Sequence, residues 1–327
     1  MARRGGWRRL GRERFRYVDS HGRPVTDVEA LERIRELVIP PAWTDVWISP
    51  SPRARLQATG FDAAGRKQYL YHAAFRAAQE RAKFERLLEF ARGLPRLRAR
   101  TSRHLRLGPY EYEWTCAVAV ALVNKAWFRV GSDRHARSSR TYGVTTLRKR
   151  HVEVSGDEIA FRFRAKNRKL VRRTITDATL AAAVDELLDL PGGTRLFRYE
   201  REGVLANLTS PSLNAYLSGA LGEGFTAKDF RTWGGTLLAA VELERRGPAA
   251  DATEEKRALA AVMRKVGHEL GNTAAVARAS YVSPSVVEHY RSGLTLADFR
   301  SVNGAGPSRL TTSEVALLEL LQTPVEG

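Results

Sequence analysis

Residues 113–130 read EWTCAVAVALVNKAWFRV, and this stretch is apolar on nearly every side of a helix. A helix that is hydrophobic all round is buried in a protein core or in a membrane. The longest uninterrupted apolar run, Cys116 to Val123, has eight residues. Because a membrane span needs roughly 20 apolar residues, we predict a buried core helix with Arg129 at its end.

The residues that follow this helix predict a small antiparallel sheet and then a series of helices. Apolar residues alternate between residues 144 and 175, and a period of two is typical of strands. We predict a turn at Ser155-Gly156-Asp157 and a hairpin whose tip is Ala165 to Arg168. Helical periodicity then predicts helices at 176–190, 212–221, 226–246, 254–270, 273–279 and 285–291.

The N-terminal residues predict short strands separated by turns. Asp27 is expected to cap a short helix over 28–37, and strands are expected at 43–49 and on both sides of the turn from Gly60 to Gly65. A basic helix is predicted from Ala73 to Arg92. The predicted fold is α+β, with a β-rich N-terminal domain at 1–78 and a mainly helical domain with a short hairpin at 79–327.

The charge of the chain predicts a polyanionic partner. The 327 residues include 54 Lys and Arg against 36 Asp and Glu, which gives a net charge of +18. Most of the excess lies in three windows, which carry +5, +7 and +10 and span residues 1–20, 76–106 and 129–173. Positive charge gathered in this way is typical of proteins that bind nucleic acid.

The single cysteine, Cys116, excludes an intramolecular disulfide and a metal site built from cysteines. The N-terminal residues contain arginines but no apolar segment of the kind that a secretory signal requires. We therefore expect an intracellular protein, and the composition rich in Arg and Ala suits a bacterial cytoplasm and its nucleoid.

Common catalytic motifs are absent from the sequence, including the phosphate-binding Walker loop, the dinucleotide-binding glycine pattern and His/Cys metal spacing. Basic and phenolic residues in unusual positions stand out instead. Arg129 ends the apolar helix, Lys166 lies at the hairpin tip, and Arg231 lies in the helix KDFRTWGG. A later segment, VGHELGNTAAVARASYVSP at 266–284, contains Asn272 and Tyr281.

The catalytic set of small poxvirus-like and bacterial type IB DNA topoisomerases resembles the order Arg129, Lys166, Arg231, Asn272 and Tyr281 in this chain. The segment TYGVTTL at 141–147, between Arg129 and Lys166, is part of the resemblance. IPPAWTDVWISP at 39–50 and GRKQYLYH at 65–72 resemble the small DNA-clamping domain of that family. The resemblance implies a monomer whose two domains clamp duplex DNA. It implies that Tyr281 cleaves one strand as a 3′-phosphotyrosyl link and that religation follows without ATP, metal or cofactor.

The residue types suit this chemistry. A tyrosine phenolate can attack a phosphodiester and retain its bond energy in a covalent link. The guanidinium groups of Arg129 and Arg231 can bind the charge that develops on the phosphate, and the amide of Asn272 adds a donor. Lys166 can protonate the leaving 5′-oxygen as a general acid.

Four further residues are predicted to contact DNA or to assist the chemistry. Lys228, three residues before Arg231, is a candidate for phosphate binding or proton relay. Gln68, Tyr69 and Tyr71 lie on a period-two strand and are candidates for contacts in the major groove.

Each assignment has a structural alternative. Arg129 could cap the end of its helix, and Arg231 could pair with Asp229 or Glu242 on a helix surface. Asn272 could cap the helix at 273–279. The spacing to Tyr281 is nine residues from Asn272 and 13 from His268, which favours Asn272 as the donor.

Tyr290 is the alternative nucleophile. Two other classes of protein also remain open. The first is a tyrosine recombinase, although Lys228 occupies the position where recombinases usually have histidine. The second is a non-enzymatic architectural DNA-binding protein.

Overall fold

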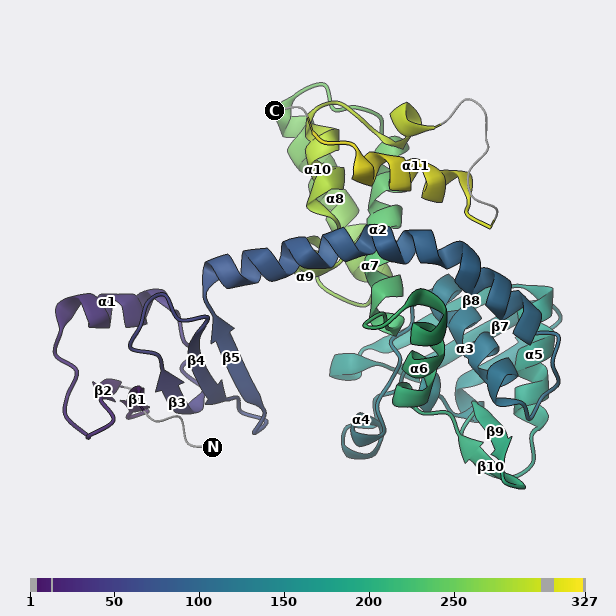
Figure 1. Cartoon of the computed structure of the whole chain (residues 1–327), viewed down its shortest axis with the longest axis horizontal. Coiled ribbons are helices and arrows are strands. Elements are labelled where there is room, and N and C mark those ends of the chain that lie inside the picture. Colours follow the sequence, from purple (N-terminus) through teal and green to yellow (C-terminus); the bar gives the residue numbers. More distant parts are fainter. Residues whose placement is uncertain (1–4, 13, 301–308, 326–327) are drawn as a thin grey trace. The chain divides into compact units, whose positions relative to one another are not determined.

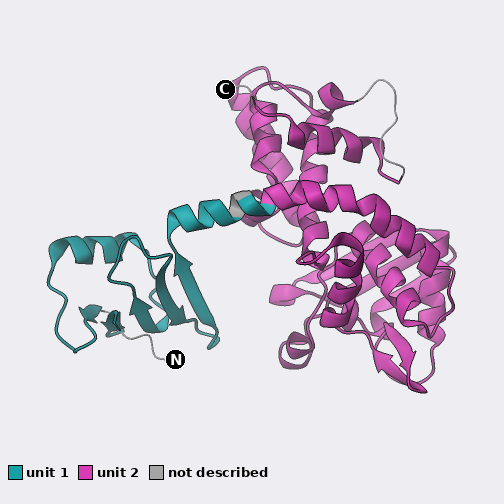
Figure 2. Ribbon diagram, viewed as in Figure 1, with its two compact units in different colours: residues 1–83 teal, residues 84–327 magenta. Residues whose placement is uncertain are grey.

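The computed structural model describes residues 5–12, 14–300 and 309–325. The chain forms two compact units, Met1–Lys83 and Phe84–Gly327, which Figure 2 colours separately. Helix α2 (Ala73–His104) begins in the first unit and ends in the second. The boundary predicted from the sequence, between residues 78 and 79, lies within this helix.

An antiparallel sheet in the order β2-β1-β3-β4-β5 forms the first unit. Helix α1 (Val28–Glu36) begins after Asp27, whose carboxylate accepts a hydrogen bond from the backbone N–H of Ala30. Ile34 of this helix packs with three buried residues of the sheet in a small core. The strands are β1 (Trp7–Leu10), β2 (Arg16–Val18), β3 (Thr44–Ile48), β4 (Leu56–Phe61) and β5 (Lys67–Tyr71).

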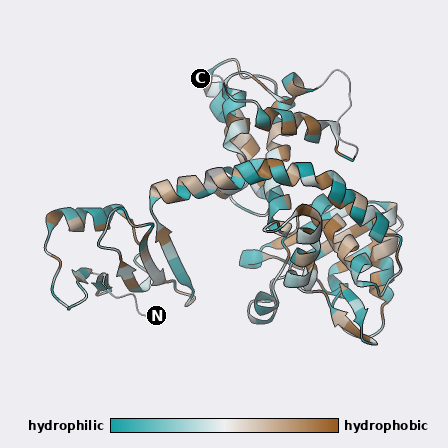
Figure 3. Cartoon of the chain, viewed as in Figure 1, coloured by the Kyte–Doolittle hydropathy of each residue, from teal (hydrophilic) through white to brown (hydrophobic). Residues whose placement is uncertain are grey.

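Helix α2 continues well beyond the predicted end at Arg92 and contains Pro95. A proline inside a helix loses one hydrogen bond and costs roughly 3 kcal/mol. Phe90, Leu94 and Leu97 are almost fully buried on the same helix, and their packing outweighs that cost. Hydrophobic and hydrophilic residues are mixed along α2 in Figure 3, as expected for a helix that buries one side.

The predicted buried helix is confirmed as α3 (Tyr112–Ala126), which is the centre of the second unit. It contacts α5 (Ala178–Asp189), α6 (Ser210–Leu221), α7 (Ala227–Glu244) and one edge of a three-stranded sheet. Its predicted end is wrong, because Trp127 adopts a left-handed backbone conformation (φ 53°) and stops the helix before Arg129.

The predicted hairpin is also confirmed in this sheet, whose strand order is β6-β7-β8. The strands are β6 (Val152–Ser155), β7 (Glu158–Arg164) and β8 (Leu170–Thr176). The remaining predicted helices are present with small shifts at their ends. They are α8 (Ala252–Glu269), α9 (Ala274–Ser280) and α10 (Pro284–Arg291).

Two α-helices and one hairpin of the second unit were not predicted. They are α4 (Asp133–Ser138), the hairpin of β9 (Arg198–Arg201) and β10 (Val204–Asn207), and α11 (Thr312–Gln322), all labelled in Figure 1. The predicted class is nevertheless confirmed, since a β-rich N-terminal unit precedes a mainly helical one with small antiparallel sheets. Within the described ranges, none of the helices has the length and hydrophobicity that crossing a membrane requires.

Candidate active site

Arg129 lies three residues beyond α3, in an extended segment that pairs with TYGVTTL. The backbone N–H of Val144 donates to the carbonyl of Arg129 (2.9 Å), and that of Thr145 donates to the carbonyl of Val130 (2.9 Å). A side chain at Gly143 would place its Cβ 2.4 Å from the Arg129 carbonyl oxygen. The glycine therefore permits the close approach that fixes the backbone of Arg129. The guanidinium of Arg129 donates to the side chain of Asn272 and to the carbonyl of Leu270, not to a carbonyl of α3, so the helix-capping alternative for Arg129 is wrong.

Arg231 projects from α7 into the interior and is only 4% exposed. Its guanidinium donates to the carbonyl of Trp127 (2.5 Å) and to that of Leu270 (2.7 Å). These bonds join α7 to the segments that follow α3 and α8. The alternative of a surface ion pair with Asp229 or Glu242 is therefore wrong.

The two glycines after Trp233 allow α7 to pack closely against the site. A Cβ at Gly234 would lie 2.2 Å from the ring nitrogen of Trp127, and a Cβ at Gly235 would lie 2.8 Å from the carbonyl oxygen of Tyr281. Glycine in a helix costs about 1 kcal/mol relative to alanine. Here it lets the helix backbone approach Tyr281.

Asn272 follows Gly271, which has a positive φ of 64° where the chain leaves α8. Its side-chain oxygen accepts a hydrogen bond from Nη2 of Arg129 (2.8 Å). The cap of α9 is Thr273, whose hydroxyl accepts from the N–H of Val276. The alternative of Asn272 as a helix cap is therefore wrong, and its amide belongs to the arginine cluster.

Tyr281 ends α9 and is 9% exposed. The guanidinium carbon of Arg231 lies 5.1 Å from the centre of its ring, and the hydroxyl of Thr236 donates to its carbonyl (3.1 Å). Burial opposes ionisation of the phenol, but the positive charges of Arg231, Arg129 and Lys228 outweigh burial and lower the pKa of Tyr281.

The alternative nucleophile, Tyr290, has a different environment. Its hydroxyl donates to the carbonyl of Gly247 (3.0 Å). Burial, followed by the negative charge of Glu254, raises the pKa of its phenol. The two tyrosines are therefore distinguished by electrostatics, and of the two, Tyr281 has the surroundings that favour the phenolate.

Arg129, Arg231, Asn272 and Tyr281 thus form one cluster. Burial, followed by the charge of Arg129, lowers the pKa of Arg231 to about 10, so the group stays charged at neutral pH. Its Nε–H is buried and has no hydrogen-bond partner among the described residues. An unpaired donor on a buried cation is suited to an anionic ligand.

Lys166 lies outside this cluster, exposed at the hairpin tip in the 3₁₀ turn η3 (Lys166–Arg168). Its neighbours Ala165 and Lys169 line a cavity of about 180 Å³ that Arg129 and Arg231 also line. The hairpin tip therefore borders the cluster, and the side chain of Lys166 itself lies in the exposed part of the turn. Lys228 is likewise exposed, in the first turn of α7.

The three candidates in the first unit lie on both faces of β5. Tyr69 and Tyr71 are exposed on one face, and their rings stack at 6.2 Å. Gln68 lies on the other face, where its amide donates to Asp62 (2.8 Å). Of the three, the two tyrosines offer exposed surface for a ligand.

Arg173 and Glu269 are important residues that the sequence reasoning missed. Arg173 of β8 donates to the carbonyl of Ala126 (3.2 Å) and forms an ion pair with Glu269 at the end of α8. It thus connects the hairpin to the last residues of α3 and α8. The sequence did contain a signal for Arg173, because it shares the inward face of β8 with Val171 and Ile175, where a cation is unusual.

His268, the alternative to Asn272, also lines the 180 Å³ cavity, but 83% of its side chain is exposed beside Glu269. Among the described residues, no group of three or more His, Cys, Asp or Glu is placed to hold a metal ion.

Comparison with known proteins shows the family of the chain. The family model described as the eukaryotic DNA topoisomerase I catalytic core matches residues 72–303, and that of the bacterial DNA topoisomerase IB N-terminal domain matches residues 14–62. DNA topoisomerase 1B of Acanthamoeba polyphaga mimivirus is 31% identical over 296 residues, which cover 88% of each chain. DNA topoisomerase 1B of Vaccinia virus (strain Copenhagen) is 27% identical over 153 residues, 44% of this chain and 48% of the viral protein. With a match over most of its length and the arginine–tyrosine cluster in place, the chain belongs to the type IB DNA topoisomerases.

Proposed function

We propose that this topoisomerase relaxes supercoiled duplex DNA by transient cleavage of one strand through Tyr281, without ATP or metal. The observation that carries the proposal is the buried Arg231, which lies beside the Tyr281 ring and whose Nε–H is unpaired among the described residues. An anion held there would contact the guanidinium and the phenol together.

In the proposed step the Tyr281 oxygen attacks phosphorus, and its phenolic proton passes to water. The new P–O bond to tyrosine forms while the bond between phosphorus and the 5′-oxygen breaks. The 3′ end stays on the enzyme as a phosphotyrosyl diester, and the 5′ end leaves as a hydroxyl. Because one phosphodiester replaces another, religation by the reverse step needs no external energy source.

Arg129, Arg231 and Asn272 would stabilise the negative charge on the phosphate oxygens. Arg129 and Arg231 both donate to the carbonyl of Leu270 (3.4 and 2.7 Å), so their guanidinium groups are held close together before DNA binds. Donors fixed in this way avoid reorganisation during the reaction. The side-chain oxygen of Asn272 holds Arg129. Its amide nitrogen donates one N–H to the carbonyl of Leu270 (3.3 Å), and the second N–H would serve as a further donor to the phosphate.

Lys166 would supply the proton to the leaving 5′-oxygen as a general acid. The support for this role is its position at the tip of a hairpin whose neighbouring residues line the same cavity as the arginines. An alkoxide is a poor leaving group, so protonation contributes about 10²–10⁴ in rate.

We further propose that the enzyme is a monomer that clamps the duplex, acts in the cytoplasm, and uses cations of both units for phosphate contacts. Tyr69 and Tyr71 are exposed on β5 in the first unit and would contact the bases or backbone there. Such binding would be strongly salt-dependent, because each neutralised phosphate releases counterions.

The test is to mix the protein with supercoiled plasmid in EDTA without ATP. The native chain should relax the plasmid and form a covalent adduct, whereas Tyr281→Phe should bind the plasmid but do neither. Tyr290→Phe is the matched control, since it also removes one phenolic hydroxyl from a buried tyrosine. Relaxation by Tyr281→Phe together with inactivity of Tyr290→Phe would transfer the role to Tyr290.

A further inference from the structure

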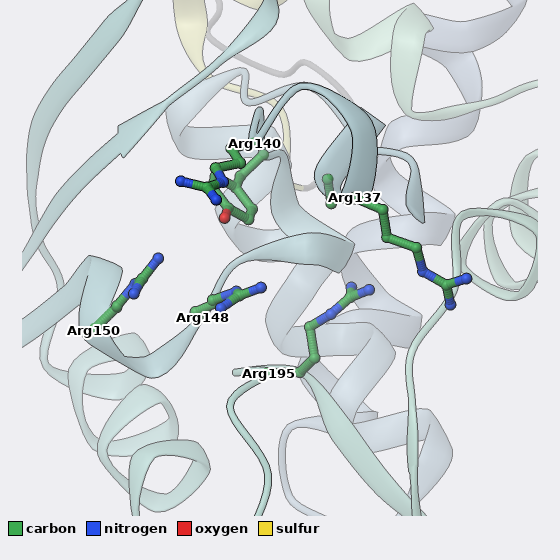
Figure 4. Close-up of a pocket in the computed structure, with 7 residues that line it drawn as sticks. Arg137, Arg140, Arg148, Arg150 and Arg195 are labelled. Carbon is green, nitrogen blue, oxygen red and sulfur yellow. The ribbon is translucent and has the colours of Figure 1, made fainter. Parts of the chain in front are cut away.

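A second cavity, of about 520 Å³, lies beside the candidate active site and is lined by five arginines. They come from α4, from the loop after it, from the 3₁₀ turn Lys149–His151 with its preceding residue, and from the segment before β9. In Figure 4 they surround one hollow from opposite sides. The lining residues are Ala136, Arg137, Arg140, Tyr142, Arg148, Arg150 and Arg195.

The charge of this cavity is almost uncompensated. Among the described residues, only Arg195 of the five forms an ion pair with a carboxylate, that of Asp133. Like charges gathered without acids repel one another, so the arrangement is suited to a bound anion. Guanidinium groups bind phosphate oxygens through paired N–H donors, which points to phosphate as the ligand class.

The local backbone supports a dedicated site rather than a solvated surface. Arg140 has a positive φ of 52°, a conformation that costs about 1–3 kcal/mol for a residue with a side chain and is typical of functional sites. His151 lies beneath the cavity, with its ring 4.4 Å from that of Tyr142. Burial, followed by the charges of Arg150 and Arg148, lowers the pKa of His151 to about 4, so the arginines remain the charged groups there.

This cavity has a common wall with the candidate active site. Tyr142 lines both the 520 Å³ cavity and the 180 Å³ cavity that contains Arg129 and Arg231. The backbone N–H of Tyr142 donates to the carbonyl of Arg164 (2.7 Å), the last residue of β7 before the hairpin tip with Lys166. Tyr142 therefore lies between the two cavities and also bonds to the hairpin.

Arg195 provides a second connection. Its guanidinium donates to the carbonyl of Thr145 (2.7 Å), and Thr145 donates through both its N–H and its hydroxyl to the carbonyl of Val130 (2.9 Å each). Val130 follows Arg129 directly. An anion bound by Arg195 and the neighbouring arginines would thus be connected, through Thr145 and Val130, to the backbone that positions Arg129.

We propose that the five-arginine cavity is a second phosphate-binding site, which holds a non-scissile phosphodiester of the duplex while the scissile phosphate lies beside Tyr281. The assignment rests on the proposed function, because it places the scissile phosphate at Tyr281. The closeness of the two cavities favours a phosphate of the same duplex over a free polyphosphate, since a backbone that enters one cavity must pass near the other. The site would fix the register of the strand.

The test uses the double variant Arg137→Gln/Arg150→Gln, whose two side chains are exposed and whose replacement leaves the Arg195 connection intact. Binding of a short duplex is measured against salt concentration in the Tyr281→Phe background, so no cleavage chemistry is involved. We expect the logarithmic salt slope to become less steep by about one for each phosphate that the variant no longer neutralises, and affinity to fall about tenfold. Arg257→Gln/Arg264→Gln, on exposed positions of α8, is the control for net charge.

The position of the phosphate is found with duplexes that carry one uncharged methylphosphonate at successive positions. At one or two positions near the cleavage site, neutralisation should weaken DNA binding by the Tyr281→Phe parent but leave DNA binding by the double variant unaffected. The proposal is overturned if the double variant behaves like the control. It is also overturned if the scissile phosphate is the only position at which neutralisation leaves binding by the double variant unaffected, because the arginines would then belong to the catalytic site.

Inorganic tripolyphosphate distinguishes the other source of phosphate. The contrary outcome is that tripolyphosphate binds the DNA-free protein through these arginines while the double variant has the same salt slope and methylphosphonate pattern as the Tyr281→Phe parent. In that case the ligand is a free anion and the proposal is wrong. If Tyr281→Phe still cleaves DNA, the proposed nucleophile is wrong, but the binding results keep their meaning because they measure contact with phosphates alone.

Discussion

The hairpin tip around Lys166 and the cluster around Arg231 are proposed to act on the same phosphate, yet they are built in opposite ways. Arg231 is 4% exposed, and two backbone carbonyls hold its guanidinium. Lys166 is exposed on a turn in which Asn167 and Arg168 have positive φ angles of 61° and 59°. Groups that stabilise charge benefit from being fixed before the substrate arrives, whereas a proton donor must only reach its oxygen in the complex. The difference predicts that variants of the two regions fail in distinct ways.

The largest effect is expected at the exposed tip. Lys166→Ala should slow single-turnover cleavage by about 10²–10⁴, the range for a lost general acid, with no change in melting temperature because the side chain is exposed. Lys166→Arg should stay slow, since arginine keeps the charge but does not give up its proton. A substrate with sulfur in place of the 5′-oxygen should largely restore the rate, and failure of that rescue would make Lys166 a phosphate contact.

Arg231→Gln should slow cleavage by about 10²–10³, the range for a lost transition-state donor, and should also destabilise the fold. The carbonyls of Trp127 and Leu270 would lose their charged donor, which costs about 1–3 kcal/mol for a buried group. The sulfur substrate should not rescue this variant.

The same variant has a second signature in its pH profile. Removal of the Arg231 charge raises the pKa of Tyr281, so the rise of the cleavage rate with pH should move to higher pH. An unchanged profile would show that Arg231 does not act on the phenol.

The two regions also differ in how far the sequence predicted them. The hairpin followed from its period-two pattern, and α3 followed from apolar residues on all its sides. The burial of Arg231 did not follow from local sequence, because Asp229 and Glu242 were possible partners on the same helix. It depends on Trp127 and Leu270, which come from two distant segments.

Long-range packing explains the other differences. Helix α2 continues through Pro95 because its neighbours bury apolar side chains. Arg173 connects three segments that no local pattern brings together. The order of Arg129, Lys166, Arg231, Asn272 and Tyr281 identified the family, which excludes a purely architectural protein and a recombinase. The grouping of four of the five in one cluster required the fold.

Asn272→Ala should slow cleavage by roughly 10²-fold with DNA binding nearly unchanged, because the amide both holds Arg129 and provides a donor. His268→Ala is the control and should change the rate only a few-fold, since its side chain is 83% exposed. Asn272→His should keep substantial activity, because imidazole can also donate. A large defect in His268→Ala beside a normal Asn272→Ala would reverse the assignment.

The smallest effect separates stability from chemistry at adjacent residues. Thr273 caps α9, where its hydroxyl accepts from the N–H of Val276 (3.3 Å), while the side chain of Asn272 bonds to Arg129 and to the carbonyl of Leu270. Thr273→Ala should therefore lower the free energy of unfolding by about 1 kcal/mol, the usual cost of a lost cap. Its cleavage rate should stay within a few-fold of the native rate, because α9 is also held by the buried Ala277 and by Tyr281. Asn272→Ala should show the reverse pattern, with a large loss of rate and little loss of stability.

Urea unfolding and single-turnover cleavage, measured on both variants, give the comparison. If Thr273→Ala lost rate as severely as Asn272→Ala, the position of Tyr281 would depend on the helix cap, and the amide of Asn272 would have no separate role in the reaction.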